Sequence, residues 1–546
     1  MDKYTGIITD AKFSKLALET SNFPKDLNRW ERLLNFLIAA SGPIDKTLEK
    51  QCYELICSTY DSMLSAFPFL ENYHVDYALF EYKLGHVERT RRIFQRALSR
   101  FNNRSLLIWV FYLQICNKLD TDNKQLFAKY EVAEQYIGMH YLSCEFWEMY
   151  LHQLKSRCRS ENRYMIVLRK TLELPIHDFS RFYTRWLQRI DSVRDLSELT
   201  LFAPREELAQ KLKIEVDYPG RRGPYLRECK KQLKKFTKEL YMVVQYQVIE
   251  MYTLFESKIS TQYYTSPQTL IPSDIIENWL KYLDFTEKLH VDPLTHLNYQ
   301  RALLPLAHYD AVWIRYARWL IEEKCDLVTA KNVLVQGLQL CNRKTGILNH
   351  LYALLVKMNE LSLLDGVLKQ TEALFDNSVE VLKDFEVFWD YIQYELFLQR
   401  SVTQKNSRYG GADDSSNEFI PGKLLGRIKA WLDLGDSRTG QTEILSMLIG
   451  LQTKGNTQVI EQVFNYLLKE SAAREFYHNS SFFWRYYCLL VFHDLSKSYL
   501  ERRTSLIESV WSQVPKANKE VVATLHDFCE SYIPEEIDTL RGMFGL

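Results

Sequence analysis

Large aromatic side chains recur along the chain at intervals of roughly 34 to 40 residues, the length of one helix pair in a helical-repeat protein. In the clearest unit, Tyr73, Tyr77 and Phe80 are spaced by three or four residues, as on one face of a helix. Gly85 ends that helix, and residues 87–98 carry a second apolar stripe. Two such helices bury their stripes against each other, but the outer face of each pair is covered only by the next pair. The pattern therefore predicts an all-α fold in which helix pairs stack into a solenoid.

One group of aromatic residues is expected to form the core of this stack, because these residues recur at similar positions in successive units. The group is Trp30, Tyr73, Tyr77, Trp109, Tyr112, Trp147, Tyr150, Trp186, Trp279, Trp313, Tyr316, Trp389 and Trp484. Core packing, rather than a ligand cage, is the role that we predict for them.

Helix-breaking residues between Pro204 and Pro224 interrupt the pattern, and a helical run over about 225–258 follows. We therefore expect an N-terminal repeat array over 1–203, a breaker-rich junction with a long connecting helix over 204–266, and a C-terminal repeat array over 267–546. Inside the second array, the segment 401–421 is polar and contains glycine, which predicts a disordered surface loop.

The composition is that of a globular protein with many large side chains. Aromatic residues make up 14% of the 546 residues, whereas glycine (19) and proline (14) are few, which favours helices packed on helices. Lys+Arg and Asp+Glu both number 69, so the formal net charge is zero and any contact with RNA is expected to be local. The cysteines form no Cys-x-x-Cys pair, which is typical of free thiols in a reducing compartment. The charged N-terminus and the short uncharged stretches predict a soluble, intracellular protein.

Motifs for catalysis and for cofactor or metal binding are missing from the sequence. It contains no phosphate-binding glycine loop, no Gly-x-Ser-x-Gly motif and no His-Glu-x-x-His motif, and its histidines are dispersed. We therefore expect a protein that is not an enzyme and that uses no cofactor and no metal.

The strongest charged feature follows the helix breakers, where basic residues are spaced along one side of a predicted helix. These candidate contacts with RNA or with an acidic partner are Arg221, Arg222, Arg227, Lys230, Lys231, Lys234, Lys235 and Lys238. The alternative interpretation of the same pattern is the solvated face of an exposed linker helix.

Two arginines on the second helix of the clearest unit, Arg92 and Arg96, also allow two interpretations. They are candidates for contact with RNA, or for ion pairs with an acid of the preceding helix such as Glu81. We favour the ion pairs.

The repeats resemble the HAT (half-a-TPR) class. The resemblance is carried by an aromatic-aromatic-Phe-Glu pattern that ends at Phe80-Glu81 and by the Arg-x-Ile-Phe-x-Arg-Ala-Leu pattern at 91–98. The stretch 299–316 is further similar to the family of pre-mRNA-processing factors 39 and 42. The segments that look closest to the budding-yeast factor 42 branch of that family are 1–4, 263–267 and 531–536. The resemblance covers essentially the whole chain.

What this resemblance implies is a non-catalytic scaffold subunit of the U1 snRNP, the particle that recognises the 5′ splice site in nuclear pre-mRNA splicing. It implies a nuclear protein that forms a heterodimer with the related pre-mRNA-processing factor 39 through C-terminal repeats. It also implies contacts with other auxiliary U1 snRNP proteins and with the core particle, including its zinc-finger subunit.

The C-terminal end of the chain supplies a candidate for that dimer interface. The last repeat of an array needs a polar cap, because no neighbour covers its outer face. Here the end is rich in apolar residues, at 482–492, 521–528 and 532–544. A contiguous apolar surplus on this surface would mark an interface.

Three other functions fit the same repeats. One is a HAT-repeat scaffold of mRNA 3′-end cleavage and polyadenylation, another is direct RNA binding through the basic residues of 221–238, and the third is a TPR-like peptide receptor. Co-purifying RNA would distinguish the 3′-end scaffold from a U1 snRNP subunit. Salt-dependent RNA binding by the isolated protein would favour direct RNA binding.

Overall fold

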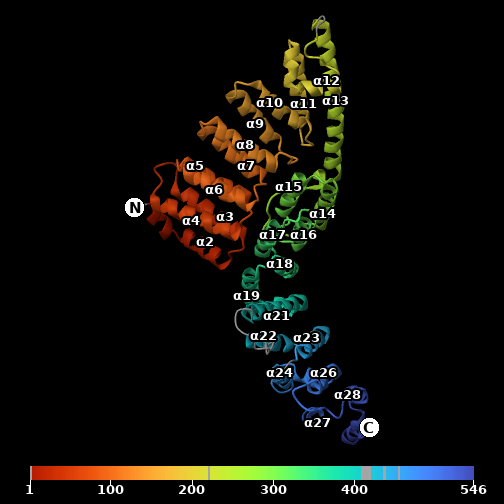
Figure 1. Cartoon of the computed structure of the whole chain (residues 1–546). Helices are drawn as coiled ribbons and strands as arrows, with labels where there is room; N and C mark the ends of the chain where they lie inside the picture. The colour runs from red at the N-terminus through yellow and green to blue at the C-terminus, as the bar shows by residue number, and fades with distance from the viewer. Residues whose placement is uncertain (1–2, 219–221, 408–419, 435–437, 453–455, 546) are drawn as a thin grey trace. The chain divides into compact units, whose positions relative to one another are not determined.

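The computed structural model describes residues 3–218, 222–407, 420–434, 438–452 and 456–545 (Figure 1). Throughout these ranges the regular elements are helices, and no β-strand occurs in them. The all-α class predicted from the sequence is confirmed. None of the helices in the described ranges combines the length and the apolar character needed to cross a membrane.

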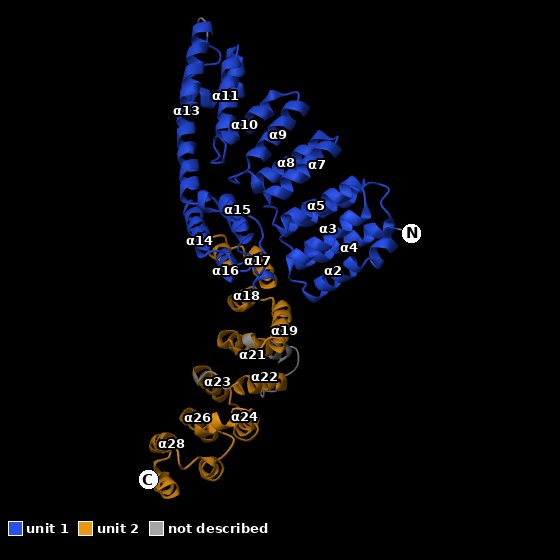
Figure 2. Cartoon of the chain, turned by 180° about the vertical axis from the view of Figure 1, so that it is seen from behind, with its two compact units in different colours: residues 1–316, 340–342 blue, residues 317–339, 343–546 orange. Residues whose placement is uncertain are grey.

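The chain divides into two compact units (Figure 2), unit 1 over Met1–Tyr316 and Leu340–Asn342 and unit 2 over Ala317–Gln339 and Arg343–Leu546. The helices of unit 1 are α1 (Lys3–Thr9), α2 (Ala11–Asn22), α3 (Leu27–Ser41), α4 (Lys50–Ala66), α5 (Glu71–Lys83), α6 (Val87–Arg100), α7 (Leu106–Leu119), α8 (Asn123–Ile137), α9 (Cys144–Arg157), α10 (Glu161–Leu172), α11 (Ser180–Ser192), η1 (Leu196–Leu201), α12 (Arg205–Leu212), α13 (Arg222–Leu254), η2 (Glu256–Lys258), α14 (Ser273–Lys288) and α15 (Asp292–Leu303). The division between the units falls within α16 (Asp310–Glu322).

The helices that follow α16 are α17 (Leu327–Leu340), α18 (Thr345–Lys357), α19 (Leu361–Asn377), α20 (Val379–Lys383), α21 (Phe385–Ser407), α22 (Gly422–Leu432), α23 (Arg438–Gly450), α24 (Thr457–Lys469), α25 (Arg474–Asn479), α26 (Ser481–Phe492), α27 (Tyr499–Ser505), η3 (Leu506–Val510), η4 (Trp511–Gln513), α28 (Lys519–Tyr532), η5 (Pro534–Glu536) and α29 (Ile537–Phe544).

The pair α5–α6 shows why the sequence folds into helix pairs. Tyr77 on α5 and Phe94 on α6 are buried, and both belong to stripes with helical spacing. The chain reverses at Gly85, whose φ of +86° lies in the left-handed region that favours glycine. The backbone N–H of Gly85 donates to the carbonyl of Tyr82 (3.0 Å), so the turn closes with its polar groups satisfied.

Hydrogen bonds from tryptophan side chains fix the loops that lead into several repeats. Trp109 is the fourth residue of α7, and its indole N–H donates to the carbonyl of Asn103, six residues earlier (2.7 Å). The same bond over six residues joins three further pairs, Trp30 to Pro24, Trp313 to Ala307 and Trp484 to His478. Besides filling the core, these indoles therefore set the angle at which the chain enters a helix.

Helix α13 carries the chain of unit 1 back towards its earlier repeats (Figure 1). With 33 residues it is about 50 Å long, at about 1.5 Å per residue. The repeats that follow it contact the first ones, since Asn102 Nδ2 donates to Gln300 Oε1 (3.2 Å). The ring of Phe69 lies 5.9 Å from that of Trp313. Unit 1 is therefore closed by contacts between its early and late repeats.

Unit 2 has a core of stacked helices built in the same manner. Phe388 of α21 stacks on Trp431 of α22 with ring centroids 5.4 Å apart. Asp433, just after α22, accepts hydrogen bonds from Tyr466 (2.6 Å) and Ser471 (2.5 Å). Helix α22 is thus joined to its neighbours by apolar packing together with polar contacts of Asp433.

The aromatic residues assigned to the repeat core are mostly buried. Those that are buried are Tyr77, Trp109, Tyr112, Trp147, Tyr150, Trp186, Trp279, Trp313, Tyr316 and Trp484. Trp30, Tyr73 and Trp389 are only half-buried. Trp30 lies in an early repeat and still makes its bond to the preceding loop.

The predicted boundaries between repeat arrays do not coincide with the division of the chain into two compact units. The predicted junction 204–266 lies inside unit 1 and contains α13, whereas the division between units comes at Tyr316. The repeat arrays over 1–203 and 267–546 therefore stay a prediction about repeat organisation. Helix α21 runs through 401–407, the start of the predicted loop at 401–421, and residues 408–419 lie outside the described residues.

Candidate interaction surfaces

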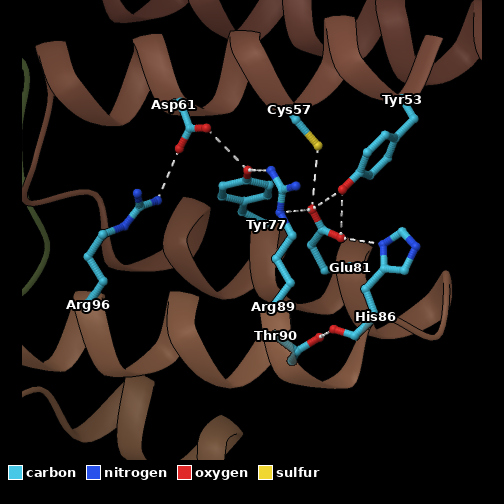
Figure 3. Close-up of polar contacts among 9 residues, drawn as sticks. All are labelled: Tyr53, Cys57, Asp61, Tyr77, Glu81, His86, Arg89, Thr90 and Arg96. Atoms are coloured by element: carbon cyan, nitrogen blue, oxygen red, sulfur yellow. Dashed lines mark hydrogen bonds and ion pairs between the residues drawn. The ribbon is translucent and has the colours of Figure 1, made fainter. Parts of the chain in front are cut away.

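A fully buried carboxylate ties α4, α5 and α6 together (Figure 3). It belongs to Glu81, which has Arg89 Nε 2.8 Å from Oε1 and His86 Nδ1 2.7 Å from Oε2. The hydroxyl of Tyr53 donates to the same carboxylate (3.1 and 3.3 Å). A buried charge is tolerated only with such partners, so this cluster fixes the helices relative to one another.

The same cluster contains a thiol that burial keeps protonated. Cys57 Sγ lies 3.4 Å from Glu81 Oε1, and burial, together with the charge of Glu81, raises the pKa of Cys57 to about 12. Burial also raises the pKa of Tyr53, with further contributions from Cys57 and Glu81. A thiol is nucleophilic only as the thiolate, so Cys57 acts here as a hydrogen-bond donor in a structural cluster.

Arg92 and Arg96, for which an acid such as Glu81 was the expected partner, are not the arginines that pair with Glu81. Arg96 forms its ion pair with Asp61 of α4 (3.0 Å), and Arg92 is exposed (Figure 3 shows the pair of Arg96). The prediction of an acid partner for Arg96 is right in kind, but the residue paired with Glu81 is Arg89. The reason is position on the helix, because Arg89 lies about one turn before Arg92 and faces α5.

An ion pair that is buried on both sides was missed by the sequence analysis. Arg301 of α15 binds Glu256 through both oxygens (2.7 and 2.9 Å), and Tyr282 donates to the same carboxylate (2.9 Å). The side chains of Arg301 and Glu256 are only 6% and 3% exposed. The signal available in the sequence was the tetrapeptide Gln-Arg-Ala-Leu, which occurs at both 95–98 and 300–303.

The basic residues of α13 fall into two sets. Lys230 Nζ donates to the backbone carbonyl of Asp191 at the end of α11 (2.9 Å), and Lys234 Nζ is 2.5 Å from the Asp191 carboxylate. The remaining members with described side chains are exposed, and they are Arg227, Lys231, Lys235 and Lys238. Arg221 and the side chain of Arg222 lie outside the described residues.

The exposed set forms one face of the helix, at spacings of three and four residues. Exposed Glu228 and Glu239 lie beside this face, so the four cations leave an excess of two positive charges, which attracts anionic groups such as phosphates or carboxylates. The full stripe of eight is therefore reduced, among described side chains, to a shorter exposed row: Arg227, Lys231, Lys235 and Lys238.

The second half of α13 exposes apolar side chains that the sequence analysis did not single out. Met242, Val243 and Tyr246 are 56%, 58% and 69% exposed. They line a groove of about 830 Å³ that continues over Phe285 and Leu289 near the end of α14. Contiguous apolar side chains of this kind are unusual on a free surface.

Most of the apolar C-terminal residues are buried within unit 2. Trp484, Leu525 and Ile533 are at most 1% exposed. The apolar side chains left on the surface are Leu495 (80%), Leu500 (64%), Tyr499 (41%) and Tyr532 (38%). The predicted surplus is thus reduced to a small patch beside α27 and the end of α28, which we call the C-terminal apolar patch.

One cluster among the described residues has the spacing of a metal site. Ligand atoms of His526, Asp527 and Glu530 on α28 lie within 4.8 Å of one another. Two of the three are exposed, and His526 already contacts Glu530 (3.4 Å) across one helical turn. Acidic surface groups of this kind are common without a metal, so the cluster gives no ground for assigning one.

Two family models match the chain. The PRP39 N-terminal HAT repeat matches residues 14–188, and the PRP39 C-terminal HAT repeat matches residues 251–388. The unmatched interval between them contains η1, α12 and most of α13.

The sequence is similar to a U1 small nuclear ribonucleoprotein component and to pre-mRNA-processing factors of the 39 type. The U1 small nuclear ribonucleoprotein component PRP42 of Saccharomyces cerevisiae is 49% identical over 546 residues, covering 100% of this chain and 99% of that protein. Pre-mRNA-processing factor 39 of Schizosaccharomyces pombe is 24% identical, covering 58% of this chain and 52% of that protein. The Saccharomyces cerevisiae factor 39 is 22% identical over 48% of this chain and 36% of its own length. Among solved structures, the crystal structure of CstF-77 covers 85% of this chain and 95% of its own, at 13% identity and a TM-score of 0.40.

Proposed function

Because the chain belongs to the PRP39 family of HAT-repeat proteins, we propose that it is a non-catalytic scaffold subunit of the U1 snRNP. In this role it acts in the nucleus, in pre-mRNA splicing, and helps 5′ splice-site recognition by linking auxiliary proteins to the core particle. The observation that carries the proposal is the 49% identity to the U1 snRNP component PRP42 over the whole of both chains.

The physical properties of the repeats support a scaffold. Ion pairs of buried carboxylates, Glu81 with Arg89 and Glu256 with Arg301, join helices, and tryptophan hydrogen bonds fix the loops between them. Helical repeats held in this way present extended surfaces at fixed separations, which suits a protein that binds several partners at once.

The partner in our proposal is a related HAT protein of the pre-mRNA-processing factor 39 type, bound as a heterodimer through the C-terminal repeats. The C-terminal apolar patch supports this assignment, because exposed Leu495 and Leu500 are suited to burial in an interface. Other auxiliary proteins and the zinc-finger subunit of the core particle are the further partners in our proposal.

The experiment that tests the function is affinity purification of the tagged chain followed by sequencing of the bound RNA. We expect U1 RNA to be strongly enriched over other small nuclear RNAs, and the related HAT protein to be recovered in equal amount. Recovery of cleavage and polyadenylation factors without U1 RNA would instead support the alternative function in mRNA 3′-end processing.

A local contact with RNA is a second candidate function, supported by the exposed row Arg227, Lys231, Lys235 and Lys238 on α13. It is compatible with the scaffold and is tested separately by the charge reversals described in the Discussion.

A further inference from the structure

Helix α13 lies along one edge of unit 1 and leaves one face exposed over most of its length (Figure 1). On that face, seven exposed residues follow one another at spacings of four, four, three, four, four and three. The average spacing is close to one helical turn, so the seven lie in a row nearly parallel to the helix axis. We call this row the mixed face of α13, and it consists of Arg227, Lys231, Lys235, Lys238, Met242, Tyr246 and Ile249.

The chemistry of the mixed face changes in the middle of the helix. Its first four residues are cations, and exposed Glu228 and Glu239 beside them leave an excess of two positive charges. Its last three residues are apolar, and Met242, Tyr246 and Ile249 are each more than half exposed. From end to end the face extends about 33 Å, at about 1.5 Å per residue. A ligand of the whole face must therefore carry negative charge over one half of its length and apolar groups over the other.

The apolar half of the mixed face continues into the groove of about 830 Å³ described above. Met242 and Tyr246 belong to both the face and the groove, and Phe285 and Leu289 near the end of α14 line the groove as well. Its volume falls within the range of about 300–1,000 Å³ that is typical of binding sites. The groove can therefore take up apolar side chains of a ligand that lies along the face.

The charges around the apolar half disfavour a nucleic acid. The charged residues that line the groove are Glu173 and Glu250, whose carboxylates repel phosphates. An RNA strand would thus bind only the basic half of the face. A membrane surface is disfavoured by the order of the residues, because an interfacial helix carries apolar side chains along its whole length. The exposed apolar residues of the mixed face begin only at Met242.

A helix is the form of ligand that suits this surface. The backbone N–H and C=O groups within α13 are used by the helix itself, so it offers no edge to which an extended strand could be added. A helical ligand satisfies its own backbone groups. Its side chains, at spacings of three and four residues, meet those of a straight row on a facing helix.

We propose that the mixed face of α13 docks an amphipathic helix of a partner protein, with carboxylates along one half and apolar side chains along the other. The carboxylates pair with Lys231, Lys235 and Lys238. The apolar side chains cover Met242 and Tyr246 and enter the groove beside them. The proposal goes beyond the U1 snRNP assignment and does not rest on it, since the surface would bind such a helix in any assembly.

The test uses the purified full-length chain and a phage-displayed library of helix-forming peptides of about 24 residues, long enough to span the face. Seven positions, spaced as on the mixed face, are randomised over all amino acids. Enriched peptides are synthesised with a fluorescent label, and their affinity is measured by anisotropy. Labelled oligouridine of about twelve nucleotides is measured in the same way as the RNA probe.

Two double variants separate the halves of the face. Lys231→Glu with Lys235→Glu reverses two charges of the basic half. Met242→Gln with Tyr246→Gln makes the apolar half polar without changing its charge. Because all four side chains are exposed, both variants should fold, and thermal melting checks this.

Each double variant has its own control. For the apolar half the control is Leu18→Gln with Ile166→Gln, at residues of unit 1 that are 63% and 57% exposed and lie outside α13. For the basic half it is a peptide in which the acidic residues are replaced by lysine. This peptide should bind the charge-reversed chain better than the original peptide does, because the signs on both sides have been exchanged.

We expect the enriched peptides to carry acidic residues in one half and apolar residues in the other. Charge reversal should weaken their binding at least about tenfold and the glutamine pair at least about fivefold, with the control pair within about twofold of the wild type. The proposal is overturned if no peptide is enriched, if the enriched peptides lack the acidic or the apolar half, or if neither double variant weakens binding. It is also overturned if oligouridine or anionic phospholipid vesicles bind more tightly than the peptides and displace them, which would assign the basic half to RNA or to a membrane.

Discussion

Trp109 and Trp279 are both buried, at 4% and 0% exposure, yet among the described residues only Trp109 has a partner for its indole N–H. The two tryptophans differ because Trp279 lies about one helical turn further from the start of its helix than Trp109 does. Because the sequence spacing of the aromatic residues is the same in both cases, the pattern predicts that each is buried but not what its nitrogen does.

This difference predicts unequal costs for the same substitution. Trp109→Phe loses its hydrogen bond to Asn103 as well as indole volume, whereas Trp279→Phe loses volume and weakens the contact of Arg301 with the ring (5.5 Å) but removes no hydrogen bond among the described residues. Trp109→Phe should therefore reduce the free energy of unfolding of unit 1 by about 1 kcal/mol more than Trp279→Phe does. Chemical denaturation of the two variants measures the difference, and equal or reversed losses would show that the bond contributes nothing.

Glu71 at the start of α5 gives a pH dependence. Burial raises the pKa of Glu71 to about 7, partly offset by a hydrogen bond with Ser105. The folded state thus holds this proton more tightly than the unfolded chain, so the contribution of Glu71 to stability is lost as pH rises from about 4.5 to about 7. Glu71→Gln should therefore match the wild type near about pH 4 and exceed its stability at about pH 8, by on the order of 1–3 kcal/mol.

Thermal melting at the two pH values tests this expectation. The control is Glu88→Gln, which removes one carboxylate of the same unit at a side chain that is 72% exposed. A difference between Glu71→Gln and the wild type that does not grow with pH would contradict the assigned burial of the Glu71 charge.

At the scale of helices, the sequence predicted α13 well and its surface only in part. Periodic apolar residues and the preceding prolines placed a long helix over about 225–258, and the structure has it at Arg222–Leu254. Which lysines are free could not be predicted, because that depends on Asp191 of α11, a residue far from them in sequence. The environment of the arginine in the repeated tetrapeptide Gln-Arg-Ala-Leu could not be predicted either. Arg96 is half-exposed beside Asp61, whereas Arg301 is buried against Glu256.

Paired charge reversals distinguish the two sets of lysines on α13. Lys231→Glu with Lys235→Glu changes exposed residues, and should weaken association with the U1 particle or RNA without changing the melting temperature. Each lost phosphate contact should lower the slope of log affinity against log salt concentration by about 0.7–0.9. The matched pair, Lys230→Glu with Lys234→Glu, removes the contacts to Asp191 and should lower stability by about 0.5–1 kcal/mol. If the exposed pair has no effect on association at low salt, the row is simply a solvated face.

At the scale of the whole molecule, the C-terminal apolar patch predicts where the proposed heterodimer is weakened. Leu495→Asp with Leu500→Asp places two charges on the patch while the buried core of unit 2 is left intact. Co-expression with the related HAT protein followed by size-exclusion chromatography should show the pair dissociating, with affinity reduced at least about tenfold. Leu270→Asp, at a residue of unit 1 that is 88% exposed, is the control. Co-elution of the double variant with its partner would place the interface elsewhere.

Helix pairs and their order followed from the sequence, but the closure of unit 1 did not. Periodicity predicts which face of each helix is buried against its neighbour in sequence. It gives no signal for the contact between Asn102 and Gln300, which are 198 residues apart. A cavity of about 450 Å³ in unit 1 escaped prediction for the same reason, because its lining, which includes Leu107 of α7 and Gln300 of α15, comes from repeats distant in sequence.

This closure bears on how the protein unfolds. An open array of repeats frays from its ends, because each repeat is stabilised only by its neighbours. In unit 1, however, the rings of Phe69 and Trp313 and the amides of Asn102 and Gln300 join early to late repeats. We therefore expect backbone amides in α5 and α15 to exchange with solvent through a common opening, with similar free energies. Forming these distant contacts also raises the contact order, so unit 1 should fold more slowly than an open stack of equal length.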